Sequence, residues 1–271
     1  MKRKMKKLLI ILAAGLMAVS CIIHIGGSSF VGTCTEEGID YTEIRDVKSF
    51  RGLSVGLPCN VYYQQADQQE VRVETTREFA DKILTEVEDG TLKLRLKDGR
   101  YPKLILRIVV SSPDIESLSV SGSGDLFHEG SLHASKDLNL KVSGSGDIRM
   151  GDIDCRNFYS SCSGSGSIQT GNVAAGDDFS GTVSGSGEID IENLTATGNV
   201  TARVSGSGDI RLHEAAVDGD MDLSSSGSGD ILVNGRCNEV TAKTSGSGNI
   251  SGTLSYNHIH VHTSGSGHVN L

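Results

Sequence analysis

Hydrophobic and polar residues alternate in short stretches through the second half of the chain. The period is two in Leu138-x-Leu140-x-Val142 and again in Ile189-x-Ile191, and many of these residues are β-branched. This alternation predicts strands with one buried face, and no stretch shows the 3.6-residue period of an amphipathic helix. We therefore expect an all-β fold.

One tetrapeptide, Ser-Gly-Ser-Gly, separates these stretches and occurs eight times. Its copies begin at Ser121, Ser143, Ser163, Ser184, Ser205, Ser226, Ser245 and Ser264. Repetition at a near-constant period of about 21 residues indicates a stacked array in which each unit covers its neighbour. Such units, made of short strands, predict a parallel β-helix. Apolar residues in mid-unit, such as Ile153 and Val173, predict a further short wall of the coil.

The glycines of the motif have two interpretations. If the alternation that ends at Val142 continues through the motif, then Gly144, Gly146 and Ile148 all face inward. The glycines would then lie inside, where two walls meet and no Cβ atom fits. In the alternative, the motif is a corner with positive φ at its glycines and no continuous alternation.

Residues 41–115 are less regular than the repeats. Alternation predicts strands around Val71-x-Val73, Leu92-x-Leu94-x-Leu96 and Leu104-x-Leu106-x-Ile108, with a hairpin turn at Glu88-Asp89-Gly90. A solenoid needs a cap over its first coil. We expect one domain over residues 41–271, in which residues 41–115 form the irregular β cap and first coils and residues 116–271 form the repeat coils.

The first residues have the pattern of an export signal. Five basic residues precede an apolar run from Leu8 to Val19, which predicts a signal peptide over residues 1–20. Ser20-Cys21 resembles a bacterial lipobox, which implies a lipid on Cys21 and anchoring to a membrane. The alternative is an ordinary signal peptide cut nearby, with Cys21 incidental. Residues 21–40 are expected to form the lipidated N-terminus and a flexible tether.

The net charge limits the possible partners of the protein, and the cysteine count limits its possible disulfides. The net charge of −9 becomes −14 without the five basic residues of the leader, because 20 basic residues then stand against 34 acidic ones. Such a surface repels phosphate backbones, so nucleic acid is excluded as a partner.

Besides Cys21, five cysteines remain, an odd number, and Cys34–Cys59 is the pair to test first for a disulfide.

Several segments resemble those of a known family. They are Phe50-Arg51-Gly52-Leu53, Val71-Arg72-Val73-Glu74, Asp89-Gly90-Thr91-Leu92-Lys93-Leu94, and the motif followed by an acid and isoleucine. Together they make residues 47–270 similar to the putative auto-transporter adhesin, head GIN domain family of Gram-negative bacteria. The resemblance implies a secreted or envelope-attached right-handed β-helix with an adhesive role.

Two groups of residues are candidate metal ligands. Asp209 and Asp230 follow successive motifs, so their carboxylates would stack about one coil apart and repel. The other interpretation is that these acids cap turn amides. His258, His260 and His262 share one face of a strand, where three imidazoles could bind zinc or copper, or simply form a polar surface. We expect neither a metal nor another cofactor.

The function predicted from these features is that of a non-enzymatic lipoprotein of the cell envelope, an adhesin or a binding or structural module. Its partners would be the membrane, through the lipid, and a glycan or protein surface. The alternative is a carbohydrate-active β-helix enzyme, a polysaccharide lyase or hydrolase. Such enzymes build their sites behind long inserted loops, and the even spacing of the motifs leaves no room for them.

Overall fold

The computed structural model describes residues 23–24 and 30–271, and strands dominate them. A single turn of 3-10 helix, η1 (Ala80–Lys82), is the only helix among these residues. Within this described part, no helix has the length and apolar character that crossing a membrane requires.

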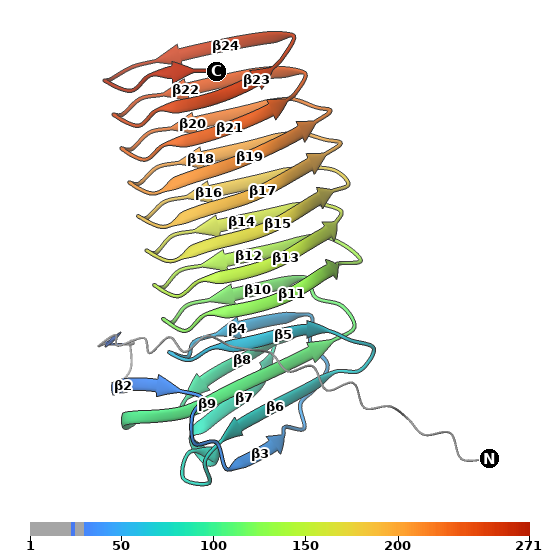
Figure 1. The fold of residues 1–271 in the computed structure, drawn as a ribbon, viewed down its shortest axis with the longest axis vertical. Helices are drawn as coiled ribbons and strands as arrows, with labels where there is room; N and C mark the ends of the chain where they lie inside the picture. The colour runs from blue at the N-terminus through green and yellow to red at the C-terminus, as the bar shows by residue number, and fades with distance from the viewer. Residues whose placement is uncertain (1–22, 25–29) are drawn as a thin grey trace, which may run out of the picture.

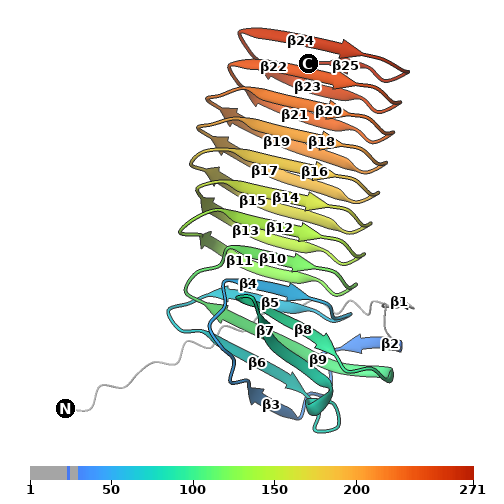
Figure 2. The same ribbon diagram turned by 180° about the vertical axis from the view of Figure 1, so that it is seen from behind.

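Two parallel sheets face each other along a rod (Figures 1 and 2). The long-strand sheet contains β5 (Val61–Gln65), β11 (Leu126–His133), β13 (Ile148–Cys155), β15 (Ser167–Ala175), β17 (Glu188–Ala196), β19 (Asp209–Val217), β21 (Ile231–Arg236), β23 (Ile250–Ser255) and β25 (Val269–Asn270). The short-strand sheet contains β4 (Gly52–Val55), β10 (Ser117–Val120), β12 (Leu138–Val142), β14 (Phe158–Cys162), β16 (Phe179–Val183), β18 (Val200–Val204), β20 (Met221–Ser225), β22 (Glu239–Thr244) and β24 (His258–Thr263). The predicted right-handed parallel β-helix with coils of about 21 residues is confirmed.

The core lies between the two sheets and follows from the alternation in the sequence. Ile189 and Ile191 of β17 are buried, and so are Val200 and Val204 of β18. Neighbouring coils are in register, so that equivalent residues stack in columns along the rod. Each buried aliphatic side chain contributes about 1.5–3 kcal/mol relative to an exposed one. The stack of columns therefore holds the coils together.

Every Ser-Gly-Ser-Gly motif forms the corner between a short strand and the next long strand. The corners are hydrogen-bonded to one another: the backbone amides of Ser207 and Gly208 both donate to the carbonyl of Gly185, at 3.0 and 3.1 Å. A Cβ atom on Gly208 would lie well under 3.0 Å from the carbonyl oxygen of Gly187. The glycines are therefore required because a side chain would collide with the preceding coil.

The predicted inward direction of the motif glycines agrees with their burial. Val204, Gly208 and Ile210 are buried, whereas Ser205 and Ser207 are exposed, so the alternation continues through the motif. The predicted exclusion of a Cβ atom is correct as well, because a carbonyl of the preceding coil occupies its place. Positive φ, the alternative explanation, occurs in these motifs only at Gly265, with φ of 108°.

The prediction of a third wall in each coil is wrong. Leu194 is buried in the same long strand, β17, as Ile189 and Ile191. Between them Glu192 and Asn193 are both exposed, so the alternation slips by one residue within the strand. Mid-unit apolar residues mark this slip, and the coil has two walls.

The cap closes the first coil with antiparallel strands, as expected. It contains β3 (Tyr41–Ile44), β6 (Glu70–Thr75), β7 (Ile83–Glu88), β8 (Thr91–Leu96) and β9 (Arg100–Ser112). Pairing of β7 with β8 and of β6 with β3 and β9 covers the edges at this end. The predicted hairpin turn joins β7 to β8 through Asp89 and Gly90, whose φ angles are 49° and 72°.

The predicted tether is wrong for residues 30–35. These residues form β2 (Phe30–Thr35), which pairs with β9 on one side and with the two residues of β1 (Ile23–His24) on the other. Cys34 and Cys59 form a disulfide with their Cα atoms 5.7 Å apart, so the expected pair is confirmed. The other described cysteines, Cys155, Cys162 and Cys237, are free and buried.

Candidate functional site

The residue after each motif belongs to a column that we call the motif ladder. Its members are Asp125, Asp147, Ser167, Glu188, Asp209, Asp230, Asn249 and His268. Asp209 Oδ1 accepts a hydrogen bond from the backbone amide of Asp230 at 2.9 Å, and Asp230 Oδ1 accepts one from the amide of Asn249 at 2.7 Å. These acids thus cap an amide of the next coil, as the structural interpretation expects.

Arginines reduce the repulsion between acids of the motif ladder. Arg149 lies 3.0 Å from Asp125 and 2.6 Å from Asp147, and so bridges two coils. Arg211 in the same way contacts Glu188 and lies 2.8 Å from Asp209. The sequence places each arginine two residues after an acid, on the same outward face of a strand.

The structure brings no further ligand to the candidate metal residues. Among the residues that it describes, no group of three or more histidine, cysteine, aspartate or glutamate side chains is arranged to hold a metal ion. His258, His260 and His262 lie on β24 beside Glu239, Thr241 and Lys243 of β22. Cys21, the candidate lipidation site, lies outside the described residues.

A second ladder, which sequence reasoning missed, occupies the opposite corner. Asn157 Oδ1 accepts from the amide of Asp178 at 3.0 Å, Asp178 Oδ1 from Asn199 at 2.7 Å, and Asn199 Oδ1 from Asp220 at 3.0 Å. The signal in the sequence was an aspartate or asparagine directly before each short strand from β12 to β24. The column begins at Asp137, whose pKa falls to about 2 because Arg156 and Asn157 donate to its carboxylate.

A hollow of about 600 Å³ lies where the cap meets the first repeat coil, and we call it the corner hollow. Its lining residues are Ser49, Phe50, Arg51, Gly52, Asp89, Gly90, Thr91, Glu116 and Ser117. They come from the start of β4, the turn between β7 and β8, and the start of β10. Two of the segments that carry the family resemblance, at residues 50–53 and 89–94, therefore meet here.

Backbone pairing holds these segments together. The amides of Arg51 and Gly52 donate to the carbonyl of Gly90 at 2.9 and 3.1 Å, and the amide of Glu116 donates to the carbonyl of Arg51 at 2.7 Å. Gly52 lies between two hydroxyl groups: a Cβ atom there would be 2.7 Å from Ser117 Oγ and 2.8 Å from Thr91 Oγ1. Glycine at this position therefore lets both hydroxyls approach the strand.

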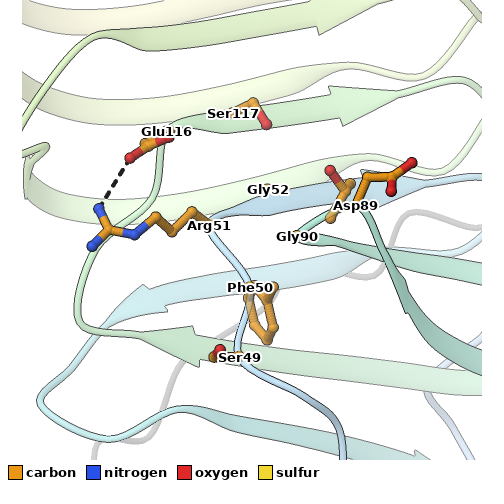
Figure 3. A pocket seen from close by; sticks show the side chains of 9 residues that line it. Ser49, Phe50, Arg51, Gly52, Asp89, Gly90, Glu116 and Ser117 are labelled. Atoms are coloured by element: carbon orange, nitrogen blue, oxygen red, sulfur yellow. Dashed lines mark hydrogen bonds and ion pairs between the residues drawn. The ribbon is translucent and has the colours of Figure 1, made fainter.

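Charged groups flank the corner hollow on two sides, as Figure 3 shows. Arg51 Nη1 lies 2.9 Å from Asp114 Oδ2 and 3.0 Å from Glu116 Oε1. Burial tends to raise the pKa of Asp114, but hydrogen bonds from Ser135 outweigh it and the pKa is lowered. Asp89 lies across the hollow and forms no ion pair with any described residue, so its carboxylate is free to accept hydrogen bonds.

The arrangement suits a ligand rich in hydroxyl groups. Arg51 donates hydrogen bonds, Asp89 and Glu116 accept them, and Thr91 and Ser117 can do both. Phe50 is buried and offers no exposed aromatic face. These residues could not be grouped from the repeat pattern, because three unrelated segments supply them, and Arg51 and Ser117 lie 66 positions apart.

A smaller hollow of about 280 Å³ lies on the outer face of the long-strand sheet. Its polar groups bind one another: Asn172 donates to Asp152 at 3.0 and 2.8 Å, and Asn193 donates to Asn172 at 2.8 Å. These groups therefore hold the coils together and are less available to a ligand than those of the corner hollow.

The chain is similar to a known protein family and to several solved structures. Residues 49–237 match the model of a family described as putative auto-transporter adhesin, head GIN domain. Among solved structures, a putative adhesin from Parabacteroides distasonis matches with a TM-score of 0.76 and 20% identity, over 87% of this chain and 98% of that chain. A putative lipid binding protein from the same species matches with 0.69 and 22%, over 87% and 97%. A putative adhesin from Parabacteroides merdae matches with 0.71 and 15%, over 88% and 99%. At these identities the likeness shows the fold. No curated protein matches the chain.

Proposed function

Because the chain belongs to the putative auto-transporter adhesin, head GIN domain family, we propose that it is a cell-envelope binding module of the adhesin type and not an enzyme. The structural role of its acidic side chains supports this proposal. Asp209 and Asp230 of the motif ladder each accept an amide of the next coil, so these carboxylates serve the scaffold. Two of the similar structures carry the name adhesin, which is consistent with this proposal.

The proposed anchor is a lipid on Cys21, after removal of residues 1–20. The support is the lipobox-like Ser20-Cys21 and the short apolar run before it. Acyl chains bind membranes because each buried methylene contributes about 0.8 kcal/mol, and two chains give stable anchoring. The protein is thus proposed to sit on a membrane of a Gram-negative cell envelope, with the solenoid as its outward part.

The proposed ligand site is the corner hollow, and the ligand class is a glycan. The observation that carries this proposal is that Arg51, Asp89 and Glu116 surround the hollow beside two hydroxyl groups. A saccharide presents donors and acceptors together, which these side chains complement. Neither anionic lipid nor nucleic acid suits a surface with this excess of acids.

We expect Arg51→Ala to weaken glycan binding about 10- to 100-fold, because a hydrogen bond to a charged group contributes about 1.5–3 kcal/mol. Arg203→Ala is the matched control. Both arginine side chains are about half exposed, at 55% and 52%, and both form surface ion pairs. Exposed pairs contribute about 0–1 kcal/mol, so neither change should unfold the protein.

The measurement is binding of the purified protein to a glycan array, followed by titration with the best glycan. Loss of binding with Arg51→Ala and retention with Arg203→Ala supports the corner hollow as the site. Equal binding by the two variants places the glycan site elsewhere. A wild-type protein that binds no glycan on the array contradicts the proposed ligand class.

A further inference from the structure

The last coil of the solenoid leaves its core open. β24 is the terminal strand of the short-strand sheet and pairs with β22 on one side, and β25 is terminal in the other sheet (Figure 1). Val261 of β24 is 52% exposed, although Ala242, its partner in β22, is buried. Within the described chain, the core thus ends in exposed apolar side chains.

The composition of this coil also differs from that of the rest of the chain. From Ile250 to Leu271 there is no aspartate, glutamate, lysine or arginine, in a chain of which 22% is charged. Exposed edge strands of soluble proteins usually carry charges or proline, which prevent pairing with other strands. β24 has neither, whereas the opposite end of the rod is closed by the antiparallel strands of the cap.

We propose that this coil binds the same coil of a second copy of the chain, end to end. The sequence of β24 from His258 to His262 is His-Ile-His-Val-His, which reads nearly the same in both directions. In an antiparallel pair centred on His260, Ile259 faces Val261 of the second copy on the core side. The histidines face one another on the outer side, so the edge is complementary to itself.

The geometry of the two sheets agrees with such a pair. A two-fold axis perpendicular to the two sheets relates the copies. Rotation about this axis reverses the direction of each strand, and the short-strand sheets of the two copies stay in one layer. β24 then meets β24 of the second copy. The two cores become continuous, and the interface closes after two copies because it is isologous.

The pairing has a consequence for adhesion. The cap, which contains β2, lies at the opposite end of the rod from β24 (Figure 1). Two paired rods therefore have their caps, with β2 beside them, at their far ends. With the lipid anchor proposed above, the pair joins two opposing membranes. This consequence rests on the proposed anchor, whereas the pairing itself does not.

The test is a single cysteine at the centre of the predicted pair. His260→Cys places two thiols opposite each other, within reach of a disulfide. Thr201→Cys is the matched control, since Thr201 lies in the same outward column three coils further in. The described native cysteines are paired or buried, and the wild-type chain shows any background from Cys21. After mild oxidation at pH 8, we expect a covalent dimer as the main species only with His260→Cys.

Light scattering of the wild-type chain checks the result without a new cysteine. Its mass at pH 8 should be twice that of one chain, and His260→Lys should halve it, while Thr201→Lys should not. A monomeric wild-type chain at pH 8 overturns the proposal, whatever the glycan array shows. Equal cross-linking of the two cysteine variants overturns it as well.

Discussion

Replacing Gly208 by alanine is expected to lower the free energy of unfolding by about 3 kcal/mol, although it adds one methyl group. The new Cβ atom would lie well under 3.0 Å from the carbonyl oxygen of Gly187. That carbonyl belongs to the corner of the preceding coil, in which the carbonyl of Gly185 accepts hydrogen bonds from the amides of Ser207 and Gly208. The backbone cannot move aside without breaking these hydrogen bonds, so the coils must separate locally.

Two controls separate this effect from the general cost of changing a residue. Gly176 is exposed and its nearest neighbour would lie 3.6 Å from an added Cβ, so Gly176→Ala should leave stability unchanged within about 1 kcal/mol. Ser207→Ala, on the exposed position beside Gly208, should stay within about 0.5 kcal/mol. Thermal unfolding should place Gly208→Ala roughly 6–12 °C below the other two. Equal melting temperatures would reject the stacking argument.

Changing Cys21 to alanine is expected to move the protein from the membrane fraction to the soluble fraction. Without the thiol no acyl chain can be attached, and about 0.8 kcal/mol of binding is lost for each methylene. Cys237→Ala is the control, because it removes a buried cysteine and leaves Cys21 in place. Fractionation followed by detergent partitioning measures the outcome. A Cys21→Ala variant that stays with the membrane refutes the lipid anchor.

The repeat made most of the fold predictable. Alternation such as Leu138-x-Leu140-x-Val142 shows the strands, and the even spacing of the motifs shows that they stack. The alternation continues through the motif, since Gly144 is less exposed than Ser143 and Ser145, but it does not show which group excludes a Cβ atom at Gly144. The missing Cβ faces the carbonyl of Gly122, a neighbour in the stack, which lies 22 residues earlier in the chain.

The cap and the candidate site were less predictable, because contacts between segments far apart in the chain form them. The small residues at positions 26–29 favour a tether, whereas pairing with β9 and the Cys34–Cys59 disulfide hold residues 30–35 in β2. The corner hollow depends on three segments that only the folded cap brings together. The ladder through Asn157 and Asp178 could have been found, since an aspartate or asparagine precedes each short strand from β12 to β24.

We expect that the repeated glycines and acids build a rod that needs no metal in order to fold. Circular dichroism and thermal unfolding in excess EDTA, compared with millimolar calcium, test it most directly. The account predicts a β-sheet spectrum and a cooperative transition in EDTA, with little change on adding calcium. Asp230→Asn should behave like the wild type, because the amide oxygen can still accept from Asn249. A chelated protein that is unfolded, and that folds when calcium is added, would contradict the account and make Asp209 and Asp230 metal ligands.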